Sequence, residues 1–264
     1  MEKKDDFYIG YVDGVSPGIK RTIKKFVLVA IGMLVISAVV FALTQNTFKN
    51  SSFELTNSSM ITGVYYEMPY PMLKVQTSED SFKNIVLLGF GKSSANPFLA
   101  KTKSEVPALS GTTLLIEGNL IYFNGKTLLQ ITDDQKISVL KEANPAQIPR
   151  SKVLVRDMEL VGEIIDPKCY FGVMKPGKGK IHRSCAVRCI SGGIPPVLAT
   201  TDDNNISEYY LITDVYGEPL HDAILPYVGK PSTLTGTVVQ LEDWYQLRLD
   251  ISTIKELNRP SKIY

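Results

Sequence analysis

The hydrophobic pattern of this 264-residue chain begins with one uninterrupted apolar stretch. Residues 26–44, with the sequence FVLVAIGMLVISAVVFALT, carry no charged side chain. As an α-helix that rises 1.5 Å per residue, the stretch spans about 28 Å, which matches the hydrocarbon core of a bilayer. The pattern therefore predicts a single transmembrane helix, and no other stretch of the sequence reaches this length without a charge.

The charges on either side of the apolar stretch predict its orientation. Four cations lie within residues 20–25, whereas Lys49 is the one cation among the dozen residues that follow the stretch. The positive-inside rule places residues 1–25 in the cytoplasm as a tail and exports the remaining chain to the periplasm or outer surface. A cleaved signal peptide is the alternative, although its apolar core usually has only 7–15 residues. Both interpretations export the rest of the chain.

After a polar Asn, Ser and Thr-rich segment, residues 45–59, which is predicted to be a spacer, apolar residues recur in short β-prone runs. Two prolines near residue 148 separate the runs into a first β domain, 60–148, and a second, 150–258. Asn124-Gly125 predicts a tight hairpin turn in the first domain. The predicted strands are 61–66, 72–76, 85–88, 112–118, 120–123, 126–132, 153–155, 159–165, 196–200, 209–212, 233–241 and 245–254, with a turn at Asp243-Trp244 before the last.

The ends of the two series are similar in sequence. Residues 112–131 and 232–251 each contain a strand, a glycine, an apolar strand, a turn and another strand. Gly118 and Gly236 take the same place, where a strongly bent strand of a small barrel requires a residue without Cβ. The pattern predicts an all-β exported region of one or two OB-like small barrels, preceded by the single transmembrane helix, and the repeat favours two.

The composition narrows the class of function. Lys and Arg number 29 against 27 Asp and Glu, a net charge of +2, whereas a dedicated nucleic-acid binder needs a basic excess. Together with export, this argues against nucleic acid as a partner. The lipid bilayer and other membrane or periplasmic proteins are the partners that the predicted location favours.

One segment, residues 162–196, carries most of the unusual chemistry. All three cysteines, Cys169, Cys185 and Cys189, lie in it, together with His182, one of the two histidines of the chain.

The stretch 180–190 has helical character, and Gly192-Gly193 favours a helix end. On such a helix His182 and the last two cysteines share one face, and Cys169 approaches from the end of the preceding strand.

This segment resembles a group of exported, mostly uncharacterised bacterial proteins with OB-like barrels. The resemblance covers residues 158–255 and implies the fold and export, but little about activity. The matching positions are Asp166, Cys169, His182, Cys185, Cys189, Gly193, Val197, Leu198, Gly236 and Val238.

A metal site is the first interpretation of the cysteines. Three thiolates and the His182 imidazole are the ligand types of tetrahedral Zn, or of Cu if Met174 joins them. One ion bound by all four requires the helix to unwind, because His182 and Cys189 lie about 10.5 Å apart along its axis.

A disulfide is the second interpretation. Exported cysteines are usually oxidised, and Cys169 paired with Cys185 or Cys189 would close a loop worth about 3 kcal/mol of stability. One cysteine would then stay unpaired. The sequence leaves the choice between metal site and disulfide open.

A reactive thiol is the third interpretation. Cys185 beside His182 and several cations has the surroundings that lower a thiol pKa, and Asp166 is predicted to orient the imidazole. Cys185 or Cys169 would then be the nucleophile of a thiol-dependent oxidoreductase or transferase.

The same segment is basic, which favours either an anion or partner site or a solvated surface. The candidate residues are Lys175, Lys178, Lys180, Arg183 and Arg188.

A Gly-Lys-Ser sequence in Gly89–Ser94 is predicted to be a plain loop after a strand. A phosphate-binding loop needs an earlier glycine, but Val86 stands there, and Pro97 argues against a following helix.

Together these patterns favour a membrane-anchored extracytoplasmic binding or accessory module over an enzyme. The predicted role is that of a subunit of a membrane redox or metal-handling system, with a Cys/His site that binds Zn or Cu or is cross-linked by a disulfide. The thiol-dependent enzyme is the alternative.

Overall fold

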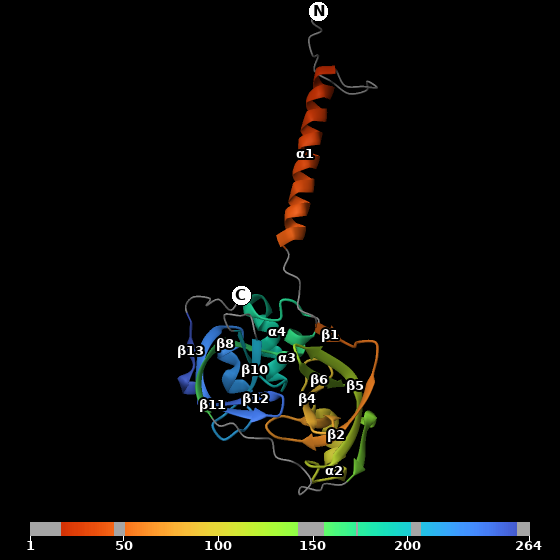
Figure 1. The fold of residues 1–264 in the computed structure, drawn as a ribbon, viewed down its shortest axis with the longest axis vertical. Coiled ribbons are helices and arrows are strands. Elements are labelled where there is room, and N and C mark those ends of the chain that lie inside the picture. Colours follow the sequence, from red (N-terminus) through yellow and green to blue (C-terminus); the bar gives the residue numbers. More distant parts are fainter. Residues whose placement is uncertain (1–16, 45–50, 142–155, 173, 202–206, 258–264) are drawn as a thin grey trace, which may run out of the picture. The chain divides into compact units, whose positions relative to one another are not determined.

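The computed structural model of the chain describes residues 17–44, 51–141, 156–172, 174–201 and 207–257. The chain divides into two compact units, Met1–Phe48 and Lys49–Tyr264. Among the described residues, the first unit contains one long helix and the second contains all the strands (Figure 1).

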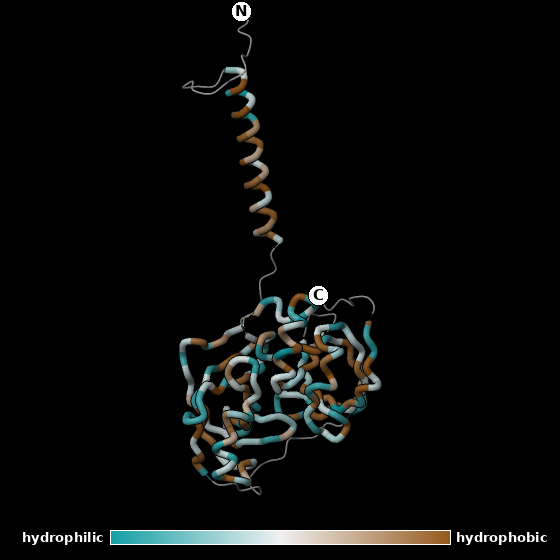
Figure 2. Tube along the Cα trace, turned by 180° about the vertical axis from the view of Figure 1, so that it is seen from behind, coloured by the Kyte–Doolittle hydropathy of each residue, from teal (hydrophilic) through white to brown (hydrophobic). Residues whose placement is uncertain are grey.

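The helix of the first unit, α1 (Pro17–Thr44), is long and apolar enough to cross a membrane, as a signal sequence also can be. Apolar residues follow one another along most of the helix (Figure 2), and none of its residues is buried. The predicted apolar span is therefore helical, and the helix extends back through the cations to Pro17, which suits a first turn. Its orientation across a membrane stays a prediction.

The first barrel is a ring of five strands in the order β2-β3-β4-β6-β5, closed by pairing of β5 with β2. Two short strands, β1 and β7, add to β5 outside the ring. The elements are β1 (Ser51–Phe53), β2 (Ser59–Tyr66), β3 (Met72–Ser78), β4 (Ser81–Gly89), α2 (Asn96–Glu105), β5 (Thr113–Phe123), β6 (Lys126–Ile131), η1 (Asp134–Lys136) and β7 (Ile137–Lys141).

The second barrel repeats the arrangement in the order β8-β9-β10-β12-β11, closed by pairing of β11 with β8. The elements are β8 (Arg156–Ile165), α3 (Pro167–Phe171), α4 (Gly179–Ser191), β9 (Val197–Thr201), β10 (Ser207–Thr213), η3 (Asp222–Tyr227), β11 (Pro231–Leu241), β12 (Trp244–Leu249), η4 (Ile251–Thr253) and β13 (Lys255–Glu256).

Both rings have the order 1-2-3-5-4-1, in which the third and fifth strands are parallel and the other neighbours antiparallel. This is the OB-fold arrangement. The prediction of an all-β region with OB-like barrels after a single N-terminal helix is confirmed, and there are two barrels.

Gly118 and Gly236 mark equivalent points in the two fourth strands. Gly118 pairs with Ser59 on one neighbouring strand and with Ile131 on the other. Gly236 likewise pairs with Met158 and Leu249. Each glycine therefore lies where its strand contacts both neighbours. A Cβ on either glycine would overlap a backbone carbonyl of the fifth strand. The predicted requirement for glycine is confirmed.

Some predicted boundaries differ. The stretches 112–118 and 120–123 form one continuous strand, β5, and the strand predicted to reach 254 ends at Leu249. The second hairpin turns at Glu242-Asp243, because Glu242 takes a positive φ of 53° while Trp244 is fully buried. The predicted strand 153–155 lies outside the described residues.

Residues of the predicted spacer also enter the first barrel. Ser51–Phe53 pairs with β5 as β1, and β2 begins at Ser59. The Asn124-Gly125 hairpin turn is confirmed, since both residues have positive φ.

The two barrels share a buried core. One cluster joins Tyr70, Met72 and Val86 of the first barrel to Phe171 and Trp244 of the second. The Trp244 Nε1 donates to the Asn84 carbonyl oxygen at 3.0 Å, which ties the indole ring to the first barrel. The second unit is therefore a pair of barrels packed on each other.

We expect Gly236→Ala to destabilise the chain by about 1–3 kcal/mol, because its Cβ would meet the carbonyl of Arg248. Thermal unfolding of the full-length chain in detergent measures this. Thr235→Ala is the matched control, since Thr235 is exposed and should change stability little. Equal effects of the two substitutions would contradict the proposed strand geometry.

Candidate metal centre

The cysteine-bearing segment is an insertion between β8 and β9, the first two strands of the second barrel, and holds α3 and α4, teal in Figure 1. Asp166 caps α3, where its Oδ1 accepts from the backbone N of Lys168 at 2.9 Å and of Cys169 at 3.4 Å. Pro167 suits the first turn, because its missing N–H has no partner to lose there. The cap fixes Cys169 one turn from the fully buried Asp166.

The predicted helix over 180–190 is confirmed as α4, which ends at Gly192-Gly193, with Gly193 at φ +92°. His182 and Cys189 are buried and Cys185 is half-buried. The side chains on the shared face of α4 thus point toward the barrels.

The three cysteines come together. Their sulfur atoms all lie within 4.8 Å of one another, and the Sγ atoms of Cys169 and Cys185 are 3.9 Å apart. Two thiolates on one tetrahedral zinc are about 3.8 Å apart, given a Zn–S bond of about 2.3 Å. All three cysteines are free thiols here, and a disulfide would require these two sulfurs to move about 2 Å closer. The disulfide stays a prediction.

His182 lies in a different group of potential ligands. Donor atoms of Asp166, Cys169 and His182 lie within 4.8 Å of one another, and His182 Nε2 is 4.0 Å from Asp166 Oδ2. The structure thus divides the predicted four-ligand set into three sulfurs and a separate Asp/Cys/His group, which share Cys169. Asp166 faces the imidazole that it was predicted to orient.

Lys92 is a site residue that the sequence did not reveal. It lies in the Gly89–Ser94 loop of the first barrel, and its Nζ is 2.8 Å from Cys185 Sγ and 3.5 Å from Cys189 Sγ. Chiefly through the hydrogen bond to Cys185, the pKa of Lys92 is raised above its ordinary value. Both barrels therefore contribute to the site.

The loop with Lys92 is held by the inserted segment. The buried Lys168 Nζ donates to the carbonyl oxygens of Gly89 and Gly91, at 2.7 Å each, and burial lowers the pKa of Lys168 to about 8. Ser94 N donates to the Gly192 carbonyl at 2.9 Å, at a point where a Cβ on Gly192 would overlap the chain of the loop.

The prediction that no helix follows this loop was wrong. α2 begins at Asn96, and Pro97 occupies its first turn, where a proline costs no hydrogen bond. The one local signal for the contact was the Gly192-Gly193 pair, which allows a close backbone approach. Nothing in the sequence near Lys92 indicated which residues it meets.

The mutual interaction of Cys169 and Cys189 separates their thiol pKa values, whereas burial acts to raise both. The interaction with Cys189 raises the pKa of Cys169, and the interaction with Cys169 lowers the pKa of Cys189. Burial alone would raise the pKa of Asp166, but the neighbouring His182 and the two thiols hold it below its ordinary value. In the metal-free site, Cys189 is thus the member of this pair that ionises first.

Two of the predicted basic residues hold the local structure. Lys175 Nζ donates to the Tyr170 carbonyl at 2.7 Å and lies 4.9 Å from the Phe123 ring centroid. Arg183 donates to backbone carbonyls of η3 and its C-cap, at Pro226 and Val228. Some of the hydrogen-bond donors of Lys175 and Arg183 are thus already bound to backbone carbonyls and are not available to an anion or partner.

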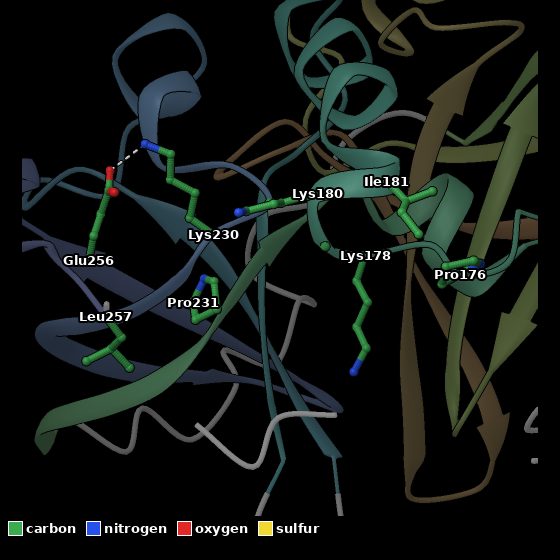
Figure 3. A pocket seen from close by; sticks show the side chains of 10 residues that line it. Pro176, Lys178, Lys180, Ile181, Lys230, Pro231, Glu256 and Leu257 are labelled. Atoms are coloured by element: carbon green, nitrogen blue, oxygen red, sulfur yellow. Dashed lines mark hydrogen bonds and ion pairs between the residues drawn. The ribbon is translucent and has the colours of Figure 1, made fainter. Parts of the chain in front are cut away.

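The remaining predicted cations lie along α4, on its outer face or at its start. Lys178 and Lys180 line a pocket of about 670 Å³ together with Lys230, which pairs with Glu256 at 2.6 Å (Figure 3). Arg188 is exposed on the same helix. Their binding of an anion or partner stays a prediction.

We expect one thiolate of the metal-free, reduced chain to form below the ordinary thiol range. Ultraviolet thiolate absorbance followed against pH measures it. Because the interaction with Cys169 lowers the pKa of Cys189, Cys169→Ala should move this first step to higher pH. Three thiols that titrate together in the ordinary range would contradict the lowered pKa of Cys189.

Comparisons with known proteins give no information about the chemistry of the site. No protein-family model matches the chain, and no curated protein matches it. The assignment of a function therefore rests on the positions of the three sulfurs, of Lys92 and of the Asp166–His182 pair.

Proposed function

We propose that the chain is a membrane-anchored extracytoplasmic module that binds Zn or Cu at Cys169, Cys185 and Cys189. The observation that carries the proposal is the convergence of the three sulfurs within 4.8 Å. The Cys169–Cys185 separation of 3.9 Å supports it, because it matches the spacing of two thiolates on one ion.

The donor set selects the class of metal. Thiolates are soft ligands that favour Zn and Cu(I) over Mg or Ca, which prefer oxygen. Lys92 contributes as a neighbour, since its ammonium hydrogen-bonds to Cys185 and favours the charged thiolate that binds a metal.

The exposure of the site suits an ion that is exchanged with a partner. Cys189 is buried, whereas Cys185 is half-buried and Lys92 is exposed. A metal ion bound by these cysteines is covered by the protein near Cys189 and accessible to solvent near Cys185 and Lys92. This supports a role as an accessory subunit of a membrane metal-handling or redox system, in contact with other membrane or periplasmic proteins.

The apolar length of α1 supports attachment to a membrane. The cations at its start favour export of both barrels, to the periplasmic side in a bacterial cell. Six residues, 45–50, connect it to β1.

The proposal predicts at least one Zn or Cu ion per full-length chain, purified in detergent without chelator. Elemental analysis combined with thiol counting measures this. Cys185→Ser should lower the metal content by one ion per chain, whereas Ser184→Ala, an exposed neighbour on α4, should leave it unchanged. A metal-free chain with one free thiol and a disulfide would overturn the proposal.

A reactive thiol is the second candidate, favoured by the 2.8 Å contact between Lys92 Nζ and Cys185 Sγ. A thiol-dependent oxidoreductase or transferase would use such a thiolate as its nucleophile.

Alkylation separates the two candidates. The metal-site proposal predicts that the chain as purified resists iodoacetamide and that chelation exposes its thiols. Rapid labelling of Cys185 before chelation, slowed by Lys92→Met, would favour the enzyme instead.

A further inference from the structure

Asp166 and His182 form a buried pair, and in the described residues one polar atom of each side chain has no hydrogen bond. Asp166 is fully buried and His182 is 5 % exposed, and neither Asp166 Oδ2 nor His182 Nε2 has a hydrogen-bond partner. Leaving such groups unpaired away from water is unfavourable. The pair therefore requires an explanation beyond the packing of α4.

The spacing of the pair is too long for a hydrogen bond and close to that of two metal ligands. Oδ2 and Nε2 are 4.0 Å apart, whereas a direct hydrogen bond would bring them to about 2.8 Å. Two such ligands on one tetrahedral zinc lie about 3.4 Å apart, given bonds of about 2.1 Å. A small movement of either side chain would complete the geometry.

Cys169 belongs to both groups of ligand atoms. It lies within 4.8 Å of the other two sulfurs and also within 4.8 Å of the Asp166 and His182 donors. A thiolate sulfur has enough lone pairs to bind two ions at once. We propose that the site holds two metal ions bridged by the Cys169 thiolate, the second ion bound by Asp166 Oδ2 and His182 Nε2.

The helix cap prepares Asp166 for this role. Its Oδ1 accepts from the start of α3, which fixes the carboxylate and leaves Oδ2 facing the imidazole. Outer hydrogen bonds of this kind commonly orient metal ligands.

The charge of the donors also fits two ions. Three thiolates and the Asp166 carboxylate carry four negative charges, which equal the charge of two divalent cations. The inference rests on the proposed metal-binding function and extends it to a binuclear centre.

Titration of the full-length, reduced chain in detergent with Co²⁺ tests the bridge. Bound metal is counted by elemental analysis after dialysis, and the Co²⁺ spins are followed by electron paramagnetic resonance. We expect two ions per chain. The resonance of the first should weaken as the second binds, because a shared thiolate couples their spins.

Two variants should remove the second ion alone. Asp166→Asn keeps an acceptor for the α3 cap and loses the anionic ligand, and His182→Ala loses the imidazole. Each should bind one Co²⁺, keep the thiolate-to-cobalt absorption and show no spin coupling. His221→Ala is the matched control, since the other histidine lies outside both ligand groups, and it should still bind two.

The possible failures are distinguishable. One ion in the unmutated chain would overturn the binuclear centre and leave the proposed function in place. Two ions without spin coupling, or two ions in both Asp166→Asn and His182→Ala, would also overturn it. No bound ion at all would overturn the proposed function itself.

Discussion

The close approach of the Gly89–Ser94 loop to the end of α4 is the contact on which the site depends. Gly192 has no room for a side chain there. The buried ammonium of Lys168 donates hydrogen bonds to two carbonyl oxygens of the same loop. This contact sets Lys92 of the first barrel against cysteines of the second. The complete site therefore exists only when both barrels are folded against each other.

The topology separates the barrel strands, which form the scaffold, from the inserted segment, which carries the candidate ligands. In the first barrel residues 67–71 connect the first two strands, whereas in the second the same connection, residues 166–196, holds two helices and every cysteine. The closed rings supply rigid strand ends, and the insertion supplies the reactive side chains. Functional groups on a loop positioned by a rigid framework are a common solution.

The sequence predicted what local patterns control. The two bend glycines, the Asn124-Gly125 turn and the α4 helix were predictable because periodicity and backbone conformation are encoded within a few residues. Lys92 was not, since its position depends on packing between residues far apart in sequence. The split of the ligands into two groups was equally hidden, because it depends on where the Asp166 cap directs Oδ2. The prediction from Pro97 that no helix follows the loop was wrong, because a proline is tolerated in the first turn of a helix.

The central claim is that sulfur atoms of the inserted segment bind a metal. X-ray absorption at the zinc edge of the zinc-loaded, full-length chain tests it most directly, because the method reports the elements bound to the ion. Binding by the cysteines predicts a sulfur shell at about 2.3 Å. A shell of oxygen and nitrogen alone would contradict it.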